Sequence, residues 1–313
     1  MKKSIVAFVC GLALSVVVLE SATRIMSPLL GPPLVSWNTM EDAKRLKLSE
    51  FHAKYKDPEY VFMGNSTVLI GLDPNIFDLE ANLPKGSSFN AAMNGSQIRQ
   101  IRDFACNYIL TNIQPKNLVI LFSNPTMAID PDYREPVTNA STVERNLYLY
   151  RYRNTFRDPM TLNTLIRVLR FQNTRQGIVY RWADNLDDFG YTKYETTQAK
   201  IATAGWTPNV MPKSIDGGQQ PIDLLGLRYL IEIRDLARAQ GGDLIIGTVP
   251  TLSLDPVYRG AIKQISKTLG LKFVEGNDAL GEGKFFQDRV HLNKQGAAKF
   301  SKFLAGELSK MNE

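Results

Sequence analysis

The stretch Glu59-Tyr60-Val61-Phe62-Met63-Gly64-Asn65-Ser66-Thr67 decides the fold that we expect for this chain. Its first half is a short apolar run with β-branched and aromatic residues, and Gly64-Asn65 then marks a sharp turn. A run bounded in this way predicts a buried strand. Open α/β sheets bind their ligands just beyond the carboxyl ends of the strands, which is where Ser66 would stand. Ser66 is therefore a candidate site residue, although a serine here can also simply cap the next helix.

The far end of the chain contains a histidine and a carboxylate that suit a serine nucleophile. The sequence has two histidines, and His52 precedes the predicted sheet, so we expect His291 to be the only histidine of the folded body. Asp288 stands three positions before His291, close enough to hold the tautomer of the imidazole. Together with Ser66 these residues supply the parts that nucleophilic serine chemistry requires. A structural histidine with an aspartate nearby by chance is the alternative interpretation.

Two further strand ends offer donors for an oxyanion. Residues 89–96 read as a second strand followed by a turn at Gly95, and residues 118–125 contain an apolar run that ends at Asn124. The backbone amide of Gly95 and the side-chain amide of Asn124, at adjacent strand ends, can point at one oxyanion. Taken singly, each is also an ordinary turn residue.

These blocks together resemble the SGNH, or GDSL-like, hydrolase superfamily. The resemblance rests on Gly-x-Ser near the first strand, glycine after the second, asparagine after the third and Asp-x-x-His near the C-terminus. It implies that Ser66 is the nucleophile, His291 the base and Asp288 its orienting carboxylate. It also implies an oxyanion hole built from the Ser66 amide, the Gly95 amide and the Asn124 side chain.

The chain departs from the pattern of that superfamily in two places. Gly64-Asn65-Ser66 stands where Gly-Asp-Ser is usual, and residues 122–125 read Phe-Ser-Asn-Pro where Gly-x-Asn-Asp is usual. Neither change removes a proposed catalytic atom, but both argue against a typical lipase or thioesterase. The resemblance covers residues 58–125 and 221–311.

The order of the expected elements predicts the fold class. Apolar runs with intervening amphipathic segments give a β-α-β order, which favours parallel pairing and a three-layer α/β/α sandwich. The resemblance implies a mostly parallel five-stranded sheet of flavodoxin-like type. The expected strands lie within residues 59–67, 89–96, 118–125, 243–250 and 271–274, and the expected helices span about 96–112, 222–240, 258–269 and the segment after Asn293.

Residues 126–220 form a long connection in which aromatic residues and arginines are mixed. A connection of this length is too long for a structureless loop, so we expect an inserted, mainly helical subdomain or lid. Arginines beside aromatic rings suit stacking on sugar faces and pairing with anionic groups. Arg151, Tyr152 and Trp182 are therefore candidate substrate-binding residues, and a small core of the insertion itself is the alternative.

The N-terminal residues predict where in the cell the protein is located. Lys2-Lys3 precede an uncharged apolar run, residues 5–19, that ends before Glu20. This pattern is typical of a signal peptide or of a short membrane span, and the lysines would stay inside. Because no clean cleavage site follows, we favour an uncleaved inner-membrane anchor over residues 1–22, with the body in the periplasm; a cleaved signal is the alternative. We expect a tether over residues 23–57 and the main domain over residues 58–313.

The composition of the chain bears on which classes of partner and cofactor we expect. The net charge is +6 and the pI about 9.1, but without zinc spacing, a recognition helix or a ribonucleoprotein motif the charge does not indicate nucleic acid. An anionic polysaccharide or an anionic membrane surface suits it better. We expect no disulfide between Cys10 and Cys106, and a single expected body histidine without paired cysteines argues against a zinc site. No cofactor is expected.

The resemblance and the anchor together favour a membrane-anchored serine O-acetyl esterase or acyltransferase, similar to alginate-type acetyltransferases. Its expected substrate is a cell-envelope or exported polysaccharide, with a membrane-bound acyl-donor protein as a further partner. Whether water or a sugar hydroxyl accepts the acyl group stays open, because both routes share the acyl-enzyme. The alternatives are a membrane-associated lipid or thioester hydrolase and a non-catalytic component of a polysaccharide export complex.

Overall fold

The computed structural model of the chain describes residues 11, 14–22, 39–123, 182–192, 224–252 and 256–311. The chain divides into two compact units. One unit comprises Met1–Leu46 and Arg134–Asp184, and the other comprises Lys47–Tyr133 and Asn185–Glu313. The expectations for residues 23–38, 126–181 and 193–220 fall outside the described residues.

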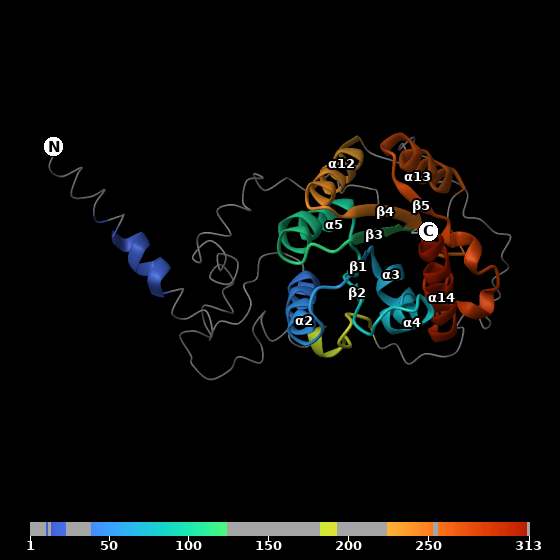
Figure 1. The fold of residues 1–313 in the computed structure, drawn as a ribbon, viewed down its shortest axis with the longest axis horizontal. Helices are drawn as coiled ribbons and strands as arrows, with labels where there is room; N and C mark the ends of the chain where they lie inside the picture. The colour runs from blue at the N-terminus through green and yellow to red at the C-terminus, as the bar shows by residue number, and fades with distance from the viewer. Residues whose placement is uncertain are drawn as a thin grey trace. The chain divides into compact units, whose positions relative to one another are not determined.

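A five-stranded sheet forms the centre of the second unit (Figure 1). The strand order is β2-β1-β3-β4-β5, and every pairing is parallel. All residues of β1 and β3 are buried, as expected for strands covered on both faces. The α/β class and the five-stranded parallel sheet are thus confirmed. The strands are β1 (Tyr60–Met63), β2 (Ser88–Asn90), β3 (Asn117–Phe122), β4 (Asp243–Thr248) and β5 (Lys272–Val274).

Helices cover both faces of this sheet and complete three layers. Right-handed crossovers place the helices that follow β1 on one face and those that follow β2, β3 and β4 on the other. In agreement, α14 packs against α3 and α4, whereas α12 packs against α5 (Figure 1). One face carries α3 (Ser66–Gly71), α4 (Pro74–Glu80) and the C-terminal helix α14 (Lys294–Lys310), which follows β5. The other face carries α5 (Ile98–Phe104), α12 (Leu224–Ala239) and α13 (Pro256–Leu269).

The strand order creates a switch point at β1. Because β1 lies between β2 and β3, the chain leaves β1 toward one edge and later returns to its other side. Such a reversal opens a crevice beyond the carboxyl ends of the strands, where open α/β sheets bind ligands. Ser66 follows β1 directly, and Gly95 lies in the loop after β2.

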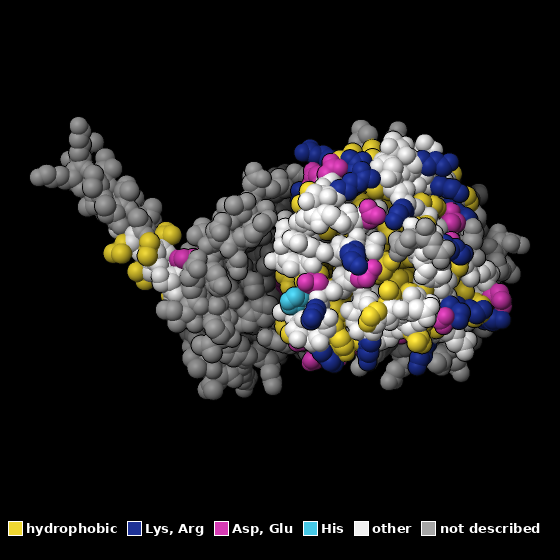
Figure 2. Space-filling model, viewed as in Figure 1, with side chains coloured by type: hydrophobic (Ala, Val, Ile, Leu, Met, Phe, Trp, Pro, Cys, Tyr) yellow, Lys and Arg dark blue, Asp and Glu magenta, His cyan; other side chains and the backbone are white. Residues whose placement is uncertain are grey.

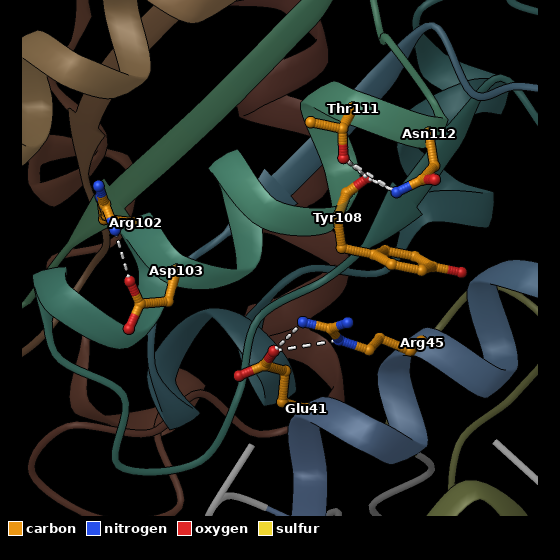
Figure 3. A network of polar contacts seen from close by, with 7 residues as sticks. All are labelled: Glu41, Arg45, Arg102, Asp103, Tyr108, Thr111 and Asn112. Carbon is orange, nitrogen blue, oxygen red and sulfur yellow. Dashed lines mark hydrogen bonds and ion pairs between the residues drawn. The ribbon is translucent and has the colours of Figure 1, made fainter. Parts of the chain in front are cut away.

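The helix expected over residues 96–112 is interrupted. It begins as α5 and continues through a π-helical segment, η1 (Ala105–Ile109), before ending as α6 (Leu110–Asn112). The Thr111 hydroxyl and the Asn112 amide both donate to the Tyr108 carbonyl oxygen, at 3.2 and 2.7 Å (Figure 3). Arg102 of α5 pairs with its neighbour Asp103 (Figure 3). It also binds Glu232 of α12 at 2.6 Å.

Helix α2 (Thr39–Tyr55) lies within the segment 23–57 that we expected to be a tether. Its Phe51 is buried and packs edge-on against Phe89 of β2, with ring centroids 5.3 Å apart. Residues from Lys47 onward therefore belong to the body. His52 lies on this helix, with its Nδ1 2.8 Å from Asp57 Oδ1, so the expectation that His291 is the only body histidine is wrong.

The segment 185–192, which we expected within the insertion, packs on the edge strand β2. The Asp187 carboxylate accepts hydrogen bonds from the backbone N–H groups of Phe189 and Tyr191 and holds a tight turn. The backbone N–H of Asn90 donates to the Phe189 carbonyl at 2.9 Å. This turn therefore covers part of an edge that would otherwise be open to another strand.

The described residues of the first unit include helical residues at 14–22, 39–46 and 182–184. Ala43 and Ala183 are buried together, with Leu46 packed against them, and Arg45 pairs with Glu41 one turn away (Figure 3). Residues 14–22 are helical and expose apolar side chains, of which Leu14 is 65% exposed. Within the described ranges, no helix has the length and apolar character needed to cross a membrane.

Candidate active site

The turn after β1 presents Ser66 at the carboxyl edge of the sheet. A Cβ on Gly64 would lie 2.8 Å from the Leu121 carbonyl oxygen of β3, so only glycine allows this approach. Asn65 is the N-cap of α3, and its Oδ1 accepts a hydrogen bond from the Thr67 N–H at 3.1 Å. Ser66 is thus the first helical residue, where N–H groups have no acceptor within the helix.

His291 joins Ser66 from the other end of the chain. Its Nε2 lies 2.8 Å from Ser66 Oγ, although the two residues are separated by 225 positions. Its Nδ1 lies 2.8 Å from Asp288 Oδ2. A carboxylate at Nδ1 favours the tautomer that carries the proton there, which leaves Nε2 free to accept the Ser66 hydroxyl proton.

The loop that carries Asp288 and His291 is tied to the rest of the fold by backbone hydrogen bonds. Gln287 N donates to the His291 carbonyl, and Leu252 N, after β4, donates to the Arg289 carbonyl, both at 2.9 Å. Phe286 and Leu292 form an isolated bridge, and both are buried. The imidazole is therefore presented by a loop that is anchored on both sides.

Asp288 is held as a carboxylate. Its partial burial opposes ionisation, but hydrogen bonds from the N–H groups of Val290 and His291 and from the His291 side chain favour the charged form. The net effect is a pKa below the ordinary value of 3.8. A negative charge therefore faces the imidazole at neutral pH and would stabilise an imidazolium.

The loop after β2 is bound to the turn that presents Ser66. The Met93 N–H and the Ser96 hydroxyl both donate to the Gly64 carbonyl oxygen, at 3.0 and 2.7 Å. Gly95, between them, adopts a left-handed conformation with φ of 66°, and a Cβ there would meet nothing within 4 Å. The structure thus brings the Gly95 loop beside the Ser66 turn.

The remaining predicted site residues are Asn124, Arg151, Tyr152 and Trp182. Asn124, Arg151 and Tyr152 lie outside the described residues. Trp182 belongs to the first unit, and 37% of it is exposed. The residues that the structure assembles are Ser66, Asp288, His291 and the Gly95 loop.

Sequence reasoning missed two buried polar groups that hold α3. The side-chain amide of Asn90 donates to the carbonyl oxygens of Val68 and Leu72, at 3.0 and 2.9 Å, and so closes the C-terminal end of the helix. At the other end, the Asn65 amide donates to the Ser123 hydroxyl. The sequence does carry a signal for such groups, which is a polar residue at the end of an otherwise apolar strand, as at Asn90 and Ser123.

One cysteine, Cys106, lies among the described residues. Burial raises the pKa of the Cys106 thiol to about 12, so it is not a thiolate at neutral pH. Among the residues that the structure describes, no group of three histidine, cysteine, aspartate or glutamate side chains is placed to hold a metal ion.

This chain is similar to several solved structures, at low sequence identity. No family model and no curated protein sequence matches this chain. It is similar to the structure of a protein from Bacteroides fragilis described as an acylhydrolase, with 13% identity, a TM-score of 0.42, and 89% of this chain and 99% of the other covered. A GDSL-like lipase from Bacteroides thetaiotaomicron gives 12% identity, a TM-score of 0.40, and coverage of 88% and 100%. A protein from Streptococcus pneumonia described as a platelet activating factor gives 12% identity, a TM-score of 0.39, and coverage of 86% and 92%. At these identities and TM-scores the likenesses assign no activity.

Proposed function

We propose that this chain is an SGNH-type serine esterase that forms an acyl-enzyme on Ser66. The observation that carries the proposal is the continuous path of hydrogen bonds from Asp288 through His291 to Ser66, with each contact at 2.8 Å. A serine hydroxyl is a weak nucleophile until an adjacent base removes its proton, and this arrangement supplies that base together with the carboxylate that orients it.

In the first half-reaction, Ser66 Oγ attacks the acyl carbonyl carbon while its proton moves to His291 Nε2. The Asp288 carboxylate stabilises the resulting imidazolium. The Ser66 and Gly95 amides, with the Asn124 side chain that the resemblance implies, donate to the oxyanion. The bond to the leaving oxygen then breaks, His291 returns the proton to that oxygen, and the acyl group stays on Ser66.

In the second half-reaction, an incoming hydroxyl attacks the acyl-enzyme. His291 takes the proton of the attacking oxygen and passes it to Ser66 Oγ as the acyl bond to serine breaks. Water as the acceptor gives an esterase, and a sugar hydroxyl gives an acyltransferase. Water and a sugar hydroxyl attack the acyl-enzyme in the same way, so Ser66 has the same role in the esterase and in the acyltransferase reaction.

The proposed substrate is an O-acetylated polysaccharide outside the cytoplasm. The support comes from the basic net charge of +6, from the N-terminal Lys2-Lys3 with its apolar run, and from Arg151, Tyr152 and Trp182 as sugar-binding candidates. On the face shown in Figure 2, basic side chains are dispersed among acidic ones. We propose that Arg151, Tyr152 and Trp182 recognise the anionic polymer.

Labelling of the purified full chain with a fluorophosphonate probe tests the acyl-enzyme. We expect covalent labelling at Ser66 in the wild type and none in Ser66→Ala, and a loss of several orders of magnitude in turnover of a small acetyl ester for Ser66→Ala and His291→Ala. His52→Ala is the matched control, because His52 also faces a carboxylate at 2.8 Å. Wild-type turnover by the Ser66→Ala protein would contradict the proposal.

The same assay with a second substrate tests the polysaccharide. Remote contacts accelerate a reaction only when the substrate is large enough to make them. We therefore expect Arg151→Ala and Trp182→Ala to lower turnover of an O-acetylated anionic polysaccharide while sparing the small acetyl ester. Equal losses on both substrates would count against the polysaccharide.

A further inference from the structure

The turn that presents Ser66 lies directly against the carboxyl end of β3. Gly64 approaches the Leu121 carbonyl so closely that any Cβ would lie 2.8 Å from that oxygen. One residue later, the side-chain amide of Asn65 donates to the Ser123 hydroxyl at 2.7 Å. Asn65 is 8% exposed and Ser123 1% exposed, so this link is shielded from water. Two contacts of different kinds thus join the turn to β3.

The two ends of the Asn65 side chain have separate tasks. Its Oδ1 accepts from the Thr67 N–H and from the Thr67 hydroxyl, at 3.1 and 2.7 Å, and this fixes the start of α3. Its Nδ2 points the other way and donates to Ser123. A buried amide that loses its partner carries a desolvation cost, so the link resists opening. One side chain therefore sets both the shape of the turn and its distance from β3.

The position of this link matters because Ser66 and His291 are held by different parts of the fold. His291 sits on a loop that is bonded to Leu252, beyond β4, through the Arg289 carbonyl. Ser66 sits on a turn that is bonded to β3 through Asn65 and Ser123. The 2.8 Å contact between Ser66 Oγ and His291 Nε2 therefore joins two segments that are supported separately.

We propose that Asn65 and Ser123 are positioning residues that hold the nucleophile turn against β3 and so keep Ser66 within reach of His291. This inference rests on the proposed function. Ser123 also immediately precedes Asn124, the expected oxyanion donor, so the same link sets the point at which the chain leaves β3. Neither side chain is required to touch the substrate.

Ser123→Ala separates positioning from a purely structural role, because it removes the acceptor and leaves the Asn65 cap of α3 intact. Misplacement of a reacting group by about 1 Å costs up to roughly a hundredfold in rate, so we expect the fluorophosphonate labelling rate of Ser66 and kcat to fall roughly ten- to a hundredfold with little change in KM. Ser301→Ala is the matched control. Ser301 is fully buried and accepts the Asp73 N–H at 2.9 Å, away from the triad. We expect both variants to lower the melting temperature, and only Ser123→Ala to lower the rate.

A second variant removes the link from the other side. Serine is a good N-cap but is too short to reach Ser123, so Asn65→Ser keeps the cap and loses the donor. If the two residues act as a unit, the double variant Asn65→Ser with Ser123→Ala should be no slower than the slower single variant. If the rate losses of the two single variants instead multiply in the double variant, Asn65 and Ser123 do not act as a unit, and the inference is overturned.

The labelling experiment also tells the two proposals apart. A wild-type chain that is labelled at Ser66, with an unchanged labelling rate in Ser123→Ala and Asn65→Ser, overturns the inference alone. A wild-type chain that is not labelled at Ser66 overturns the proposed function and this inference with it. Loss of rate in Ser123→Ala and Asn65→Ser, but not in Ser301→Ala, supports both.

Discussion

Asp288 uses its two carboxylate oxygens for two purposes. Oδ1 accepts the backbone N–H groups of Val290 and His291, at 2.9 and 2.8 Å, which shapes the loop. Oδ2 accepts from the imidazole at 2.8 Å. The residue therefore builds the loop that carries the base and also selects the tautomer of that base.

The Asp288→Asn variant should retain the conformation of the loop and lose most of its esterase activity. An amide oxygen can still accept the two N–H groups, but an NH₂ facing Nδ1 favours the tautomer whose Nε2 carries the proton and cannot accept from Ser66. We expect kcat on a small acetyl ester to fall by about a thousandfold or more, with the fold intact by circular dichroism. Asp57→Asn, beside His52, is the matched control and should retain activity. Retained activity in Asp288→Asn would remove the carboxylate from the mechanism.

The lowered pKa of Asp288 predicts the direction in which the stability of the folded chain changes in acid. The pKa of Asp288 is lowered in the folded chain, so its contribution to stability is fully present above its ordinary pKa of 3.8 and is lost as the pH falls through the lower folded value. The melting temperature of the wild type should therefore drop more steeply than that of Asp288→Asn below about pH 4. Parallel curves for the two proteins would contradict the lowered pKa.

At the scale of elements, the edge of β2 depends on a turn that is distant in sequence. Segment 185–192 places the Phe189 ring against Phe51 and Tyr55 of α2, with centroids 5.9 and 5.3 Å apart. Asp188 pairs with Lys54 on the same helix. The turn, α2 and β2 thus form one packed corner, and Gly190 lies at its tightest point.

Gly190→Ala should destabilise this corner. Gly190 has a φ of 73°, and a Cβ there would meet the Asn90 carbonyl oxygen and lie 2.7 Å from the Phe89 ring. Left-handed strain and overpacking together should cost roughly 2–4 kcal/mol of unfolding free energy. Gly241 is the matched control, because its φ is 77° but a Cβ would meet nothing within 4 Å, so Gly241→Ala should cost only about 1–2 kcal/mol. Equal losses in urea unfolding would show that the close approach is unimportant.

At the scale of the whole molecule, the N-terminal segment bears on the location that we propose for this chain. The helical residues 14–22 expose Leu14, Val17 and Leu19. Figure 2 shows a group of apolar side chains on this segment. Lys2-Lys3 precede them in the sequence. An apolar segment behind two lysines is the pattern that holds a protein at a membrane with its body outward.

We predict that this segment stays on the mature protein and anchors it. Mass spectrometry of the native protein from the membrane fraction should find a peptide that includes residues 12–19. Carbonate washing should leave that protein in the pellet, since it removes only peripheral proteins. A mature chain that begins near Ala22 or Thr23 in the soluble fraction would show instead a cleaved signal.

The sequence alone was sufficient for the strands and for most of the helices. Each central strand is a compact apolar run between turn residues, and burial on both faces of a parallel sheet demands such a run. Helix α4 is not among the expected helices, although Asp73 is its N-cap and Pro74 is a proline in its first turn. The π-helical segment η1 was also missed, since an apolar stripe does not reveal a local change of helical pitch.

What the sequence determined by itself was the set of reactive groups, a serine after the first strand and an aspartate with a histidine near the C-terminus. Only the tertiary structure decided that Ser66 and His291 meet, because 225 residues separate them and a hydrogen bond depends on distances that no local pattern encodes. It likewise decided that Asn65 bonds to Ser123, and that residues 47–55 and 185–192 belong to the body. Local propensity specifies the elements, whereas contacts between distant segments arise when the apolar faces of those elements are buried together.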